Sequence, residues 1–134
     1  MVREKTLAII KPDAVTAGFT GEIIKLIELN GFVIVRMEKK QLAARDGERF
    51  YAVHRGKSFF NELVSYISSG PVIVMALERE NAIQEWRNLM GATDPAKAQI
   101  GTLRKMFGKH IGSNATHGSD APETAAQELA FFFS

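Results

Sequence analysis

Cysteine is absent from this sequence of 134 residues. Its absence excludes disulfide bonds, thiolate metal ligands and cysteine nucleophiles. Long apolar runs are absent as well, because no stretch approaches the ~20 residues that cross a bilayer as a helix. The segment from Met1 to Lys5 lacks the apolar core of a secretory signal. We therefore expect a cytoplasmic protein that does not enter a membrane.

An excess of charge of one sign is also missing. The 17 basic residues nearly balance the 15 acidic ones, which leaves a net charge of +2. A nucleic-acid-binding domain normally has a clear basic excess, so we expect no nucleic-acid partner. Histidines and carboxylates are not grouped with the spacing of metal ligands, which predicts no metal site formed by the protein alone.

The composition that remains is that of an ordinary globular protein, with 46% apolar and 24% charged residues. No linker, repeat or low-complexity tract interrupts the chain. Its length fits one domain by the usual size range. We therefore expect a single domain over residues 1–134.

Apolar residues recur with the period of a strand in some segments and of a helix in others. Strands are expected at 6–10, 32–39, 72–77 and briefly after residue 113; helices are expected at 20–29, within 44–68 with a break around Gly56, at 81–90, at 102–107 and from about 120 to 130. A capping box of Asp120 and Glu123 marks the start of the last helix. Strand-helix-strand, twice over, predicts a ferredoxin-like α+β fold (βαββαβ), an antiparallel four-stranded sheet with helices on one face.

Two further segments have distinctive compositions. The stretch 92–113 is irregular and long for so small a domain, and such loops are usually functional. The chain ends in Phe131, Phe132, Phe133 and Ser134. Consecutive phenylalanines are costly to expose to water, so we expect them in the core or in a subunit interface.

One histidine lies in a segment that suits a reactive group. His117 belongs to Asn114-Ala115-Thr116-His117-Gly118-Ser119-Asp120, among small and hydroxylated residues. Imidazole is a nucleophile near neutral pH, because its unperturbed pKa of about 6.5 leaves one ring nitrogen bare. An acceptor must hold the other ring proton, and Glu128 in the last helix can supply it. His54 and His110 have no such neighbours and are expected to be ordinary surface histidines.

Candidate groups for binding an anion are spread along the chain. A transferring phosphoryl group needs cations and hydrogen-bond donors in place of water. Lys11 directly follows the first expected strand, and Arg104 lies at a helix start that can receive an anion. Phe59, with Leu63 one helical turn further on, can stack on a nucleobase without reading its identity. The other candidates are Arg87, Thr93, Tyr51 and Asn114.

These residues lie in segments that resemble the nucleoside diphosphate kinases over essentially the whole chain, in the same order and spacing. The segments are Lys11-Pro12-Asp13, Tyr51 with His54, Phe59-Phe60, Gly70-Pro71-Val72, Gly91-Ala92-Thr93-Asp94-Pro95, Gly101-Thr102-Leu103-Arg104 and the heptapeptide around His117. The resemblance implies that His117 takes the γ-phosphate of a nucleoside triphosphate and passes it to a diphosphate. This is a ping-pong reaction at one site with little base specificity.

The resemblance also implies a role for each candidate residue. Glu128 orients His117, Ser119 supports it, and Phe59 and Leu63 sandwich the base. The phosphates and the sugar are bound by Lys11, Tyr51, Arg87, Thr93, Arg104 and Asn114. Mg²⁺ arrives with the nucleotide. The resemblance further implies a homo-oligomer, for which we expect a hexamer rather than a tetramer.

The sequence departs from the family pattern in one segment. Ile100 replaces a common proline, Lys105 and Met106 replace a small residue followed by aspartate, and Ser113 replaces a frequent arginine. In family members this segment builds subunit contacts. We therefore expect the departures to affect loop rigidity and assembly before chemistry.

The alternative is a non-enzymatic ferredoxin-like module that binds nucleotides or RNA. An RNA-recognition module would interleave aromatic and basic residues on its middle strands. Neither the segment 32–36 nor the segment 72–75 has that pattern. A third possibility is an inactive relative that binds nucleotides without turnover, which the presence of His117 and Glu128 disfavours.

Overall fold

The computed structural model describes residues 3–133. A four-stranded antiparallel sheet forms its centre, with the strand order β2-β3-β1-β4. The strands are β1 (Arg3–Ile10), β2 (Val33–Gln41), β3 (Pro71–Glu80) and β4 (Thr116–Gly118). The sheet and its order confirm the predicted α+β, ferredoxin-like fold.

The two central strands are the apolar runs of the sequence. Leu7 to Ile10 on β1 and Val72 to Leu77 on β3 are almost wholly buried. β1 is longer than predicted, because its polar start pairs with the charged end of β3, with Arg3 opposite Glu80 and Lys5 opposite Glu78. A buried apolar run therefore marks the middle of such a strand and not its ends.

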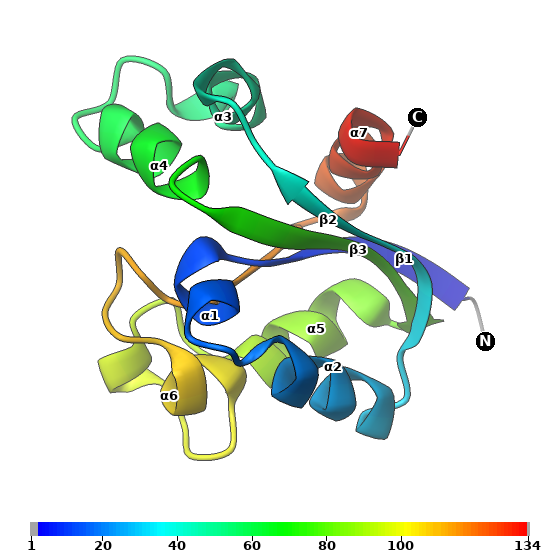
Figure 1. Cartoon of the computed structure of the whole chain (residues 1–134). Coiled ribbons are helices and arrows are strands. Elements are labelled where there is room, and N and C mark those ends of the chain that lie inside the picture. Colours follow the sequence, from blue (N-terminus) through cyan, green and yellow to red (C-terminus); the bar gives the residue numbers. More distant parts are fainter. Residues whose placement is uncertain (1–2, 134) are drawn as a thin grey trace.

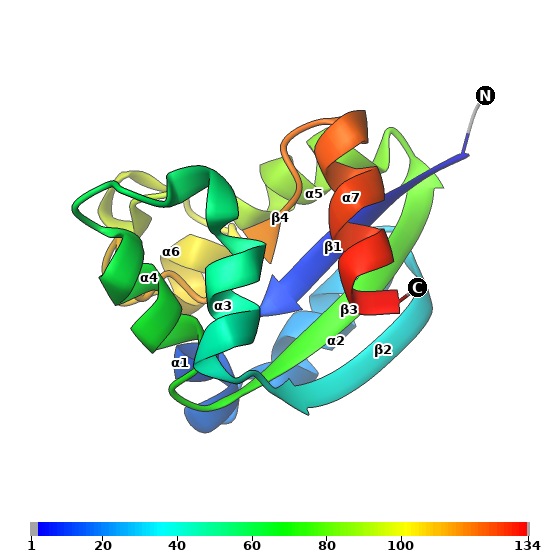
Figure 2. The same cartoon turned by 90° about the horizontal axis from the view of Figure 1, so that it is seen from above.

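Helices cover both faces of the sheet (Figures 1 and 2). On one face lie α1 (Pro12–Thr16), α2 (Thr20–Leu29), α5 (Ala82–Met90) and α6 (Leu103–Phe107); on the other lie α3 (Ala44–Phe50), α4 (Phe60–Ile67) and α7 (Pro122–Phe133). Two short 3-10 turns, η1 (Ala52–His54) and η2 (Pro95–Lys97), complete the order.

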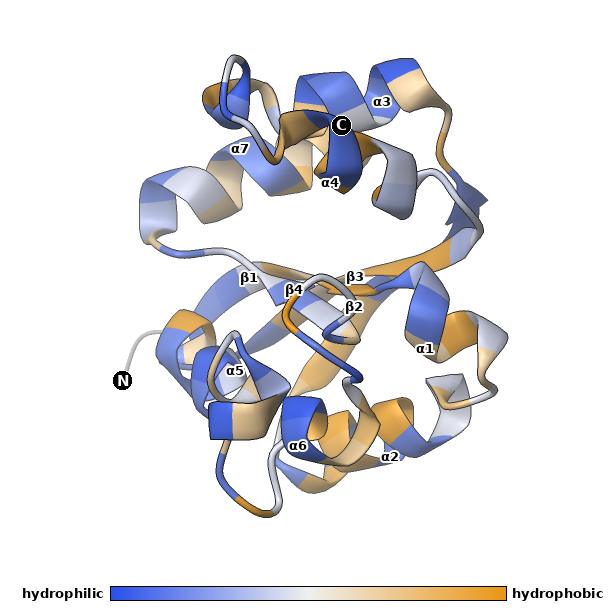
Figure 3. Cartoon of the chain, turned by 90° about the vertical axis from the view of Figure 1, so that its left-hand side faces the viewer, coloured by the Kyte–Doolittle hydropathy of each residue, from blue (hydrophilic) through white to orange (hydrophobic). Residues whose placement is uncertain are grey.

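The expectation of helices on one face was therefore wrong. Alternate side chains of β1 are apolar in both directions: Ala8 and Ile10 join the core with α2 and α5, whereas Leu7 and Ile9 join a second core with α3, α4 and α7. Figure 3 shows the sheet between these two helical layers. A strand that is apolar on both sides needs cover on both sides.

The helix predictions hold with local differences. α2 has the predicted bounds, and α3 and α4 are separated around Gly56 as predicted. α1 was missed, because a proline that directly follows an apolar run is compatible with the end of the expected strand at 6–10. Proline is equally suited to the first helical position, where it lies here.

The last helix does not begin with the predicted capping box. Pro122 occupies the first helical position, and the Ala125 amide donates to the Ala121 carbonyl at 2.9 Å. Asp120 is therefore one residue too early to cap the helix, and its carboxylate accepts from Arg87 instead. The helix also extends beyond Ala130, to Phe133.

Because α7 extends to Phe133, the three consecutive phenylalanines lie in or against the core formed with α3 and α4. Phe132 is buried in the core formed with α3 and α4, and its ring centroid lies 5.4 Å from that of Phe50. Phe131 and Phe133 are half-buried against the same core, beneath the guanidinium groups of Arg49 and Arg36. The predicted burial of this segment in the core is confirmed for Phe132 and is partial for its neighbours.

Exposed apolar residues gather on the edge strand β2. Val33, Val35 and Met37 are 50%, 43% and 49% exposed, and β2 pairs with β3 on one side only. Within residues 3–133, no helix is both long enough and apolar enough to cross a bilayer.

Candidate active site

All the residues predicted to contact a nucleotide lie around one cleft of about 900 Å³. This volume is within the usual range for small-ligand sites. The predicted residues in its lining are Lys11, Tyr51, Phe59, Leu63, Arg87, Thr93, Arg104, Asn114 and His117. Segments far apart in the sequence therefore meet at a single site.

His117 is placed in the cleft by strand pairing. It lies on β4, where its backbone is opposite Ile9 of β1. Its Nε2 atom lies 3.1 Å from Oε1 of Glu128 on α7, and both side chains are largely buried. Among residues 3–133, Nδ1 has no hydrogen-bond partner and is not buried. The carboxylate thus favours a proton on Nε2 and leaves the Nδ1 lone pair free.

Ser119 holds the carboxylate of Glu128 on the side away from the cleft. Its hydroxyl donates to Oε1 of Glu128 at 2.7 Å and accepts from the Leu7 amide at 3.4 Å. The serine thereby ties the carboxylate to the backbone of β1. This geometry agrees with the predicted supporting role of Ser119.

Trp86 and Gly118 fix the backbone of the histidine. The indole Nε1 of Trp86 donates to the His117 carbonyl at 3.0 Å. A Cβ atom on Gly118 would lie 2.3 Å from Cδ1 of Trp86, so only glycine allows this close approach. Neither residue was predicted to serve the site, because the contact depends on tertiary packing alone.

Lys11 is held by the segment before β4. Its Nζ donates to Oδ1 of Asn114 at 2.9 Å, and its backbone amide donates to the Ala115 carbonyl at 2.7 Å. Asn114, almost fully buried, also donates to the Thr93 carbonyl at 2.9 Å. Burial, and then the nearby Arg104 guanidinium, lower the pKa of Lys11 to about 8.

The two arginines differ in how firmly they are held. Arg104 is buried and donates to the carbonyls of Gly91 and Thr116, both at 3.0 Å. Burial, and then Arg87, lower its pKa to about 10, so it remains cationic near neutral pH. Arg87 is exposed and pairs with Asp120 at 2.9 Å. An exposed pair of this kind contributes little and exchanges readily for another anion.

Tyr51 is a buried residue of the cleft lining, and its phenol lies near the carboxylate of Glu128. Burial, and then the charge of Glu128, raise its pKa, so the phenol stays neutral at any physiological pH. A neutral phenol can donate a hydrogen bond to a ligand oxygen.

The outer part of the cleft is apolar. Phe59 is 43% exposed and Leu63 is half-buried, and both lie in the lining as predicted. Ile111, 62% exposed, also lines the cleft and was missed. An isolated apolar residue in an irregular loop has no periodic signal that could have revealed it.

His54 is half-buried in the lining of the cleft and is not an ordinary surface histidine, whereas His110 is exposed as predicted and also borders the cleft. The His54 ring centroid lies 5.4 Å from that of Phe59, and His54 is half-buried. Nδ1 of His110 accepts from the Gly112 amide at 3.1 Å and closes a tight turn. Their sequence neighbours gave no sign of these contacts.

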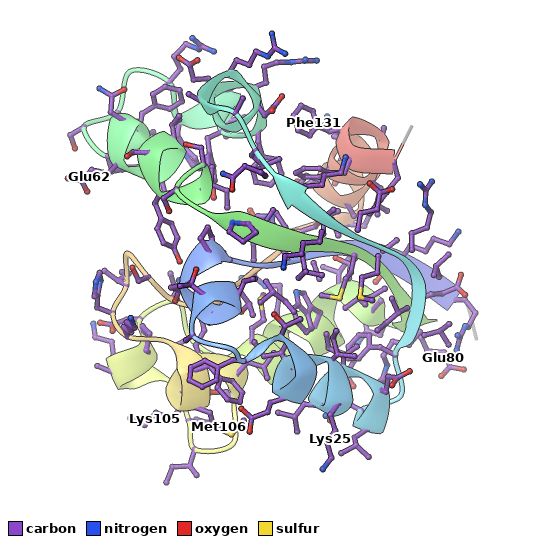
Figure 4. All side chains as sticks on the ribbon, viewed as in Figure 1. Lys25, Glu62, Glu80, Lys105, Met106 and Phe131 are labelled. Carbon is purple, nitrogen blue, oxygen red and sulfur yellow. The ribbon has the colours of Figure 1, made fainter. Side chains whose placement is uncertain are left out.

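The four departures from the family pattern are not among the residues predicted to bind phosphate. Ile100 is 93% exposed at the tip of its loop. Lys105 and Met106 lie on the outer side of α6 (Figure 4). Ser113 is half-buried in the lining of the cleft. Their effect on assembly stays a prediction.

Carboxylates are sparse at the site. Glu62 and Asp120 line the cleft, and Glu128 lies behind His117. No group of three or more histidine, aspartate or glutamate side chains within residues 3–133 is arranged to hold a metal ion. A free imidazole nitrogen, a lysine and two arginines around a nucleotide-sized cleft define a phosphotransferase site.

Comparisons with known proteins assign the family. The sequence model described as "Nucleoside diphosphate kinase" matches residues 4–134. The nucleoside diphosphate kinase of Trichlorobacter lovleyi is 58% identical over 130 residues, which cover 97% of this chain and 94% of the relative. The chain therefore belongs to the nucleoside diphosphate kinase family, and its activity is that of the family.

Solved structures agree in fold over the whole length. The nucleoside diphosphate kinase of Aquifex aeolicus superposes with a TM-score of 0.97 at 40% identity, covering 99% of this chain and 96% of that one. The enzyme of Halobacterium salinarum, in complex with CDP, has a TM-score of 0.95 at 38% identity, covering 99% and 89%. The predicted family, fold and activity are confirmed.

Gly118→Ala tests whether Trp86 positions the histidine. The new methyl group must displace the indole ring, so we expect a loss of about 1–3 kcal/mol of stability and a lower kcat. Trp86 is the only tryptophan, so its fluorescence reports the displacement directly. Gly21→Ala is the matched control, because a Cβ at Gly21 meets nothing within 4 Å. Normal stability, fluorescence and kcat in the Gly118 variant would refute this role.

Proposed function

We propose that the chain transfers the γ-phosphate of a nucleoside triphosphate to a nucleoside diphosphate through a phosphohistidine on His117. The observation that supports this most strongly is that the two nitrogens of the His117 ring have different environments. Glu128 holds Nε2, and Nδ1 remains free in a cleft lined by Lys11, Arg87 and Arg104. A nucleophile with its second nitrogen held by an acceptor suits attack on phosphorus.

The reaction proceeds in two half-reactions. The Nδ1 lone pair forms a bond to the γ-phosphorus, and the bond from that phosphorus to the β,γ-bridging oxygen breaks. The nucleoside diphosphate leaves with that electron pair. A terminal phosphate oxygen of a second nucleoside diphosphate then attacks the phosphohistidine, and Nδ1 recovers its lone pair. Glu128 stabilises the imidazolium character that develops when Nδ1 bonds to phosphorus.

The cations supply the electrostatic part of catalysis. Lys11 and Arg104 are fixed by hydrogen bonds before a nucleotide arrives, so little reorganisation is needed in the transition state. Arg87 is free to exchange the exposed Asp120 carboxylate for a phosphate. Tyr51, Thr93 and Asn114 offer neutral polar groups for the phosphates and the sugar.

Mg²⁺ is proposed to arrive with the nucleotide. The donor set fits this proposal, because the cleft lining offers Glu62 and Asp120 rather than a cluster of carboxylates. Phosphate oxygens are hard ligands of the kind that Mg²⁺ prefers, and the bound ion would reduce their negative charge.

The apolar part of the cleft suits a base clamp without base readout. Phe59 and Leu63 were predicted to sandwich the base, and we propose Ile111 as an additional wall. Stacking depends on the π-face that every base has, so it tolerates purines and pyrimidines. The binding of CDP by the Halobacterium salinarum relative supports nucleotide binding in this cleft.

We also propose that the chain forms a homo-oligomer, with a hexamer preferred over a tetramer. The edge strand β2 has backbone groups on one side that no strand of the described chain pairs with, and Val33, Val35 and Met37 are exposed on it. Such an edge is normally covered or protected. Pairing with the same edge of a second copy would form a two-fold interface. A cytoplasmic location and the lack of a nucleic-acid partner stay predictions.

The phosphohistidine is tested with γ-labelled ATP. Wild-type protein should retain acid-labile label, and His117→Ala should abolish it. Glu128→Gln should slow the labelling by about 10²-fold, because a neutral amide no longer stabilises the charged ring. Glu123→Gln is the matched control for the glutamate variant, since Glu123 is exposed at the start of the same helix and does not line the cleft. Folded wild-type protein without label would reject the mechanism.

The pKa of Lys11 predicts the alkaline side of the pH profile. The cationic form binds phosphate, and deprotonation above about pH 8 removes that charge. We expect kcat/KM, which reports the free enzyme, to fall above about pH 8. The fall in kcat should lie at higher pH, because bound phosphate favours protonated Lys11. Lys11→Gln should have low activity without this alkaline limb; a variant that keeps the limb would assign it to another group.

Assembly is tested by a charge on the edge strand. Val35→Lys should reduce the particle mass measured by light scattering after size exclusion, because each copy of an interface would have to bury a lysine. Val53→Lys is the matched control, since Val53 is 84% exposed on η1, away from β2. An unchanged mass for Val35→Lys, or a monomeric wild-type protein, would contradict the proposed interface.

A further inference from the structure

The carboxylate of Asp13 lies behind the cleft, and the proposed reaction gives it no role. Asp13 follows Lys11 and Pro12 at the start of α1 and is half-buried. It lines a small pocket of about 280 Å³ behind the cleft wall and is not part of the lining of the cleft itself. Its contacts, however, lead directly to the catalytic segment.

Asp13 joins two elements that are distant in sequence. Its Oδ2 accepts from the Ala115 backbone amide at 3.1 Å. Its Oδ1 accepts from the hydroxyl of Tyr66, which lies on α4 and lines the cleft. One carboxylate thus connects the segment before His117 to a wall of the nucleotide site.

Ala115 needs such support because of its backbone conformation. Its φ is 74°, in the left-handed region, and it is fully buried. A left-handed conformation is unfavourable for alanine, which has no polar side chain to stabilise it locally. Asp13 holds the amide of this residue, and the Lys11 amide donates to its carbonyl at 2.7 Å. Both peptide groups flanking Ala115 are therefore fixed by residues 11–13.

The neighbours of Ala115 are residues of the active site. Asn114 accepts from Nζ of Lys11, and Thr116 begins the strand that holds His117. A change at Ala115 therefore shifts Lys11 and His117 relative to each other. Errors of about 1 Å between reacting groups cost about 10²-fold in rate.

We propose that Asp13 is a positioning residue for phosphoryl transfer, supported by Tyr66: its carboxylate holds Ala115 in the left-handed conformation and thereby sets Lys11 against His117. This inference rests on the proposed function. Asp13 contacts no substrate in this account and acts through the residues that do.

Asp13 also acts on Lys11 through its charge. Three charged or titratable groups face Lys11 from different helices: Arg104 from α6, Asp13 from α1 and Tyr66 from α4. Arg104 lowers the pKa of Lys11, whereas Asp13 raises it. Tyr66 remains neutral, because burial and its bond to Asp13 raise its own pKa. Without the Asp13 charge, the pKa of Lys11 should fall further below its present value of about 8.

The test compares Asp13→Asn with Tyr66→Phe in the same nucleotide-exchange assay. For Asp13→Asn we expect kcat/KM to fall about 10- to 100-fold near neutral pH, with the alkaline limb moved to lower pH than in wild type. Tyr66→Phe removes one hydroxyl and keeps the Asp13 charge, so it should lose less activity with the limb in place. A purely structural role of Asp13 would lower activity without moving the limb.

The outcomes separate this inference from the proposed function. Wild-type protein without phosphoryl transfer rejects the proposed function itself. If the wild-type protein is active and Asp13→Asn has the same kcat/KM and the same alkaline limb as wild type, only the role of Asp13 is overturned. A moved limb with a loss of kcat/KM supports it.

A second variant covers the case in which Asp13→Asn does not fold. Glycine adopts a positive φ without support, so adding Ala115→Gly should restore folding while the limb stays displaced. A double variant that folds with the limb at its wild-type position overturns the inference. A double variant that remains unfolded also overturns it, because the strain at Ala115 would then not be what Asp13 offsets.

Discussion

The pairing of β4 with the end of β1 determines where Lys11 and His117 lie. In this register Ile10 lies opposite Thr116, and Ile9 lies opposite His117. One residue beyond this pairing, the Lys11 amide donates to the Ala115 carbonyl at 2.7 Å. A lysine after one strand and a histidine on the other are thereby set at a fixed separation by backbone hydrogen bonds. Backbone pairing is a rigid support, which precise positioning for phosphoryl transfer requires.

Around this support, the three cationic side chains of the cleft already have partners of their own. Lys11 donates to Asn114, Arg104 to two carbonyls and Arg87 to Asp120. These partners hold Lys11 and Arg104 in place, so the charges are oriented before the substrate binds. Nδ1 of His117 is the contrasting case, because its ring is held through Nε2 while the reactive nitrogen stays free. Lys11, Arg104 and the His117 ring are thus held by hydrogen bonds, whereas the exposed Arg87 is held by a surface ion pair.

Part of this arrangement could be predicted from local patterns, because two of the residues proposed to bind phosphate lie at element boundaries. The others were assigned by the resemblance to the family. Lys11 follows an apolar run, and Arg104 follows a helix cap. The missed features have other causes. Pro12 is compatible with both a strand end and a helix start, so α1 escaped prediction. The second helical layer was missed although β1 is apolar on both sides, a pattern that calls for cover on both faces. The contacts of Gly118 with Trp86 and of Asp13 with Ala115 join distant segments, and no local pattern records them.

Nδ1 of His117 is proposed to be the atom that becomes phosphorylated, because Glu128 retains Nε2. The most direct measurement is nuclear magnetic resonance of protein labelled with ¹⁵N in its histidine rings and phosphorylated by ATP. The coupling between ³¹P and ¹⁵N identifies the phosphorylated nitrogen. We expect coupling to Nδ1 of His117. Coupling to Nε2, or a phosphoryl group on any other residue, would contradict it.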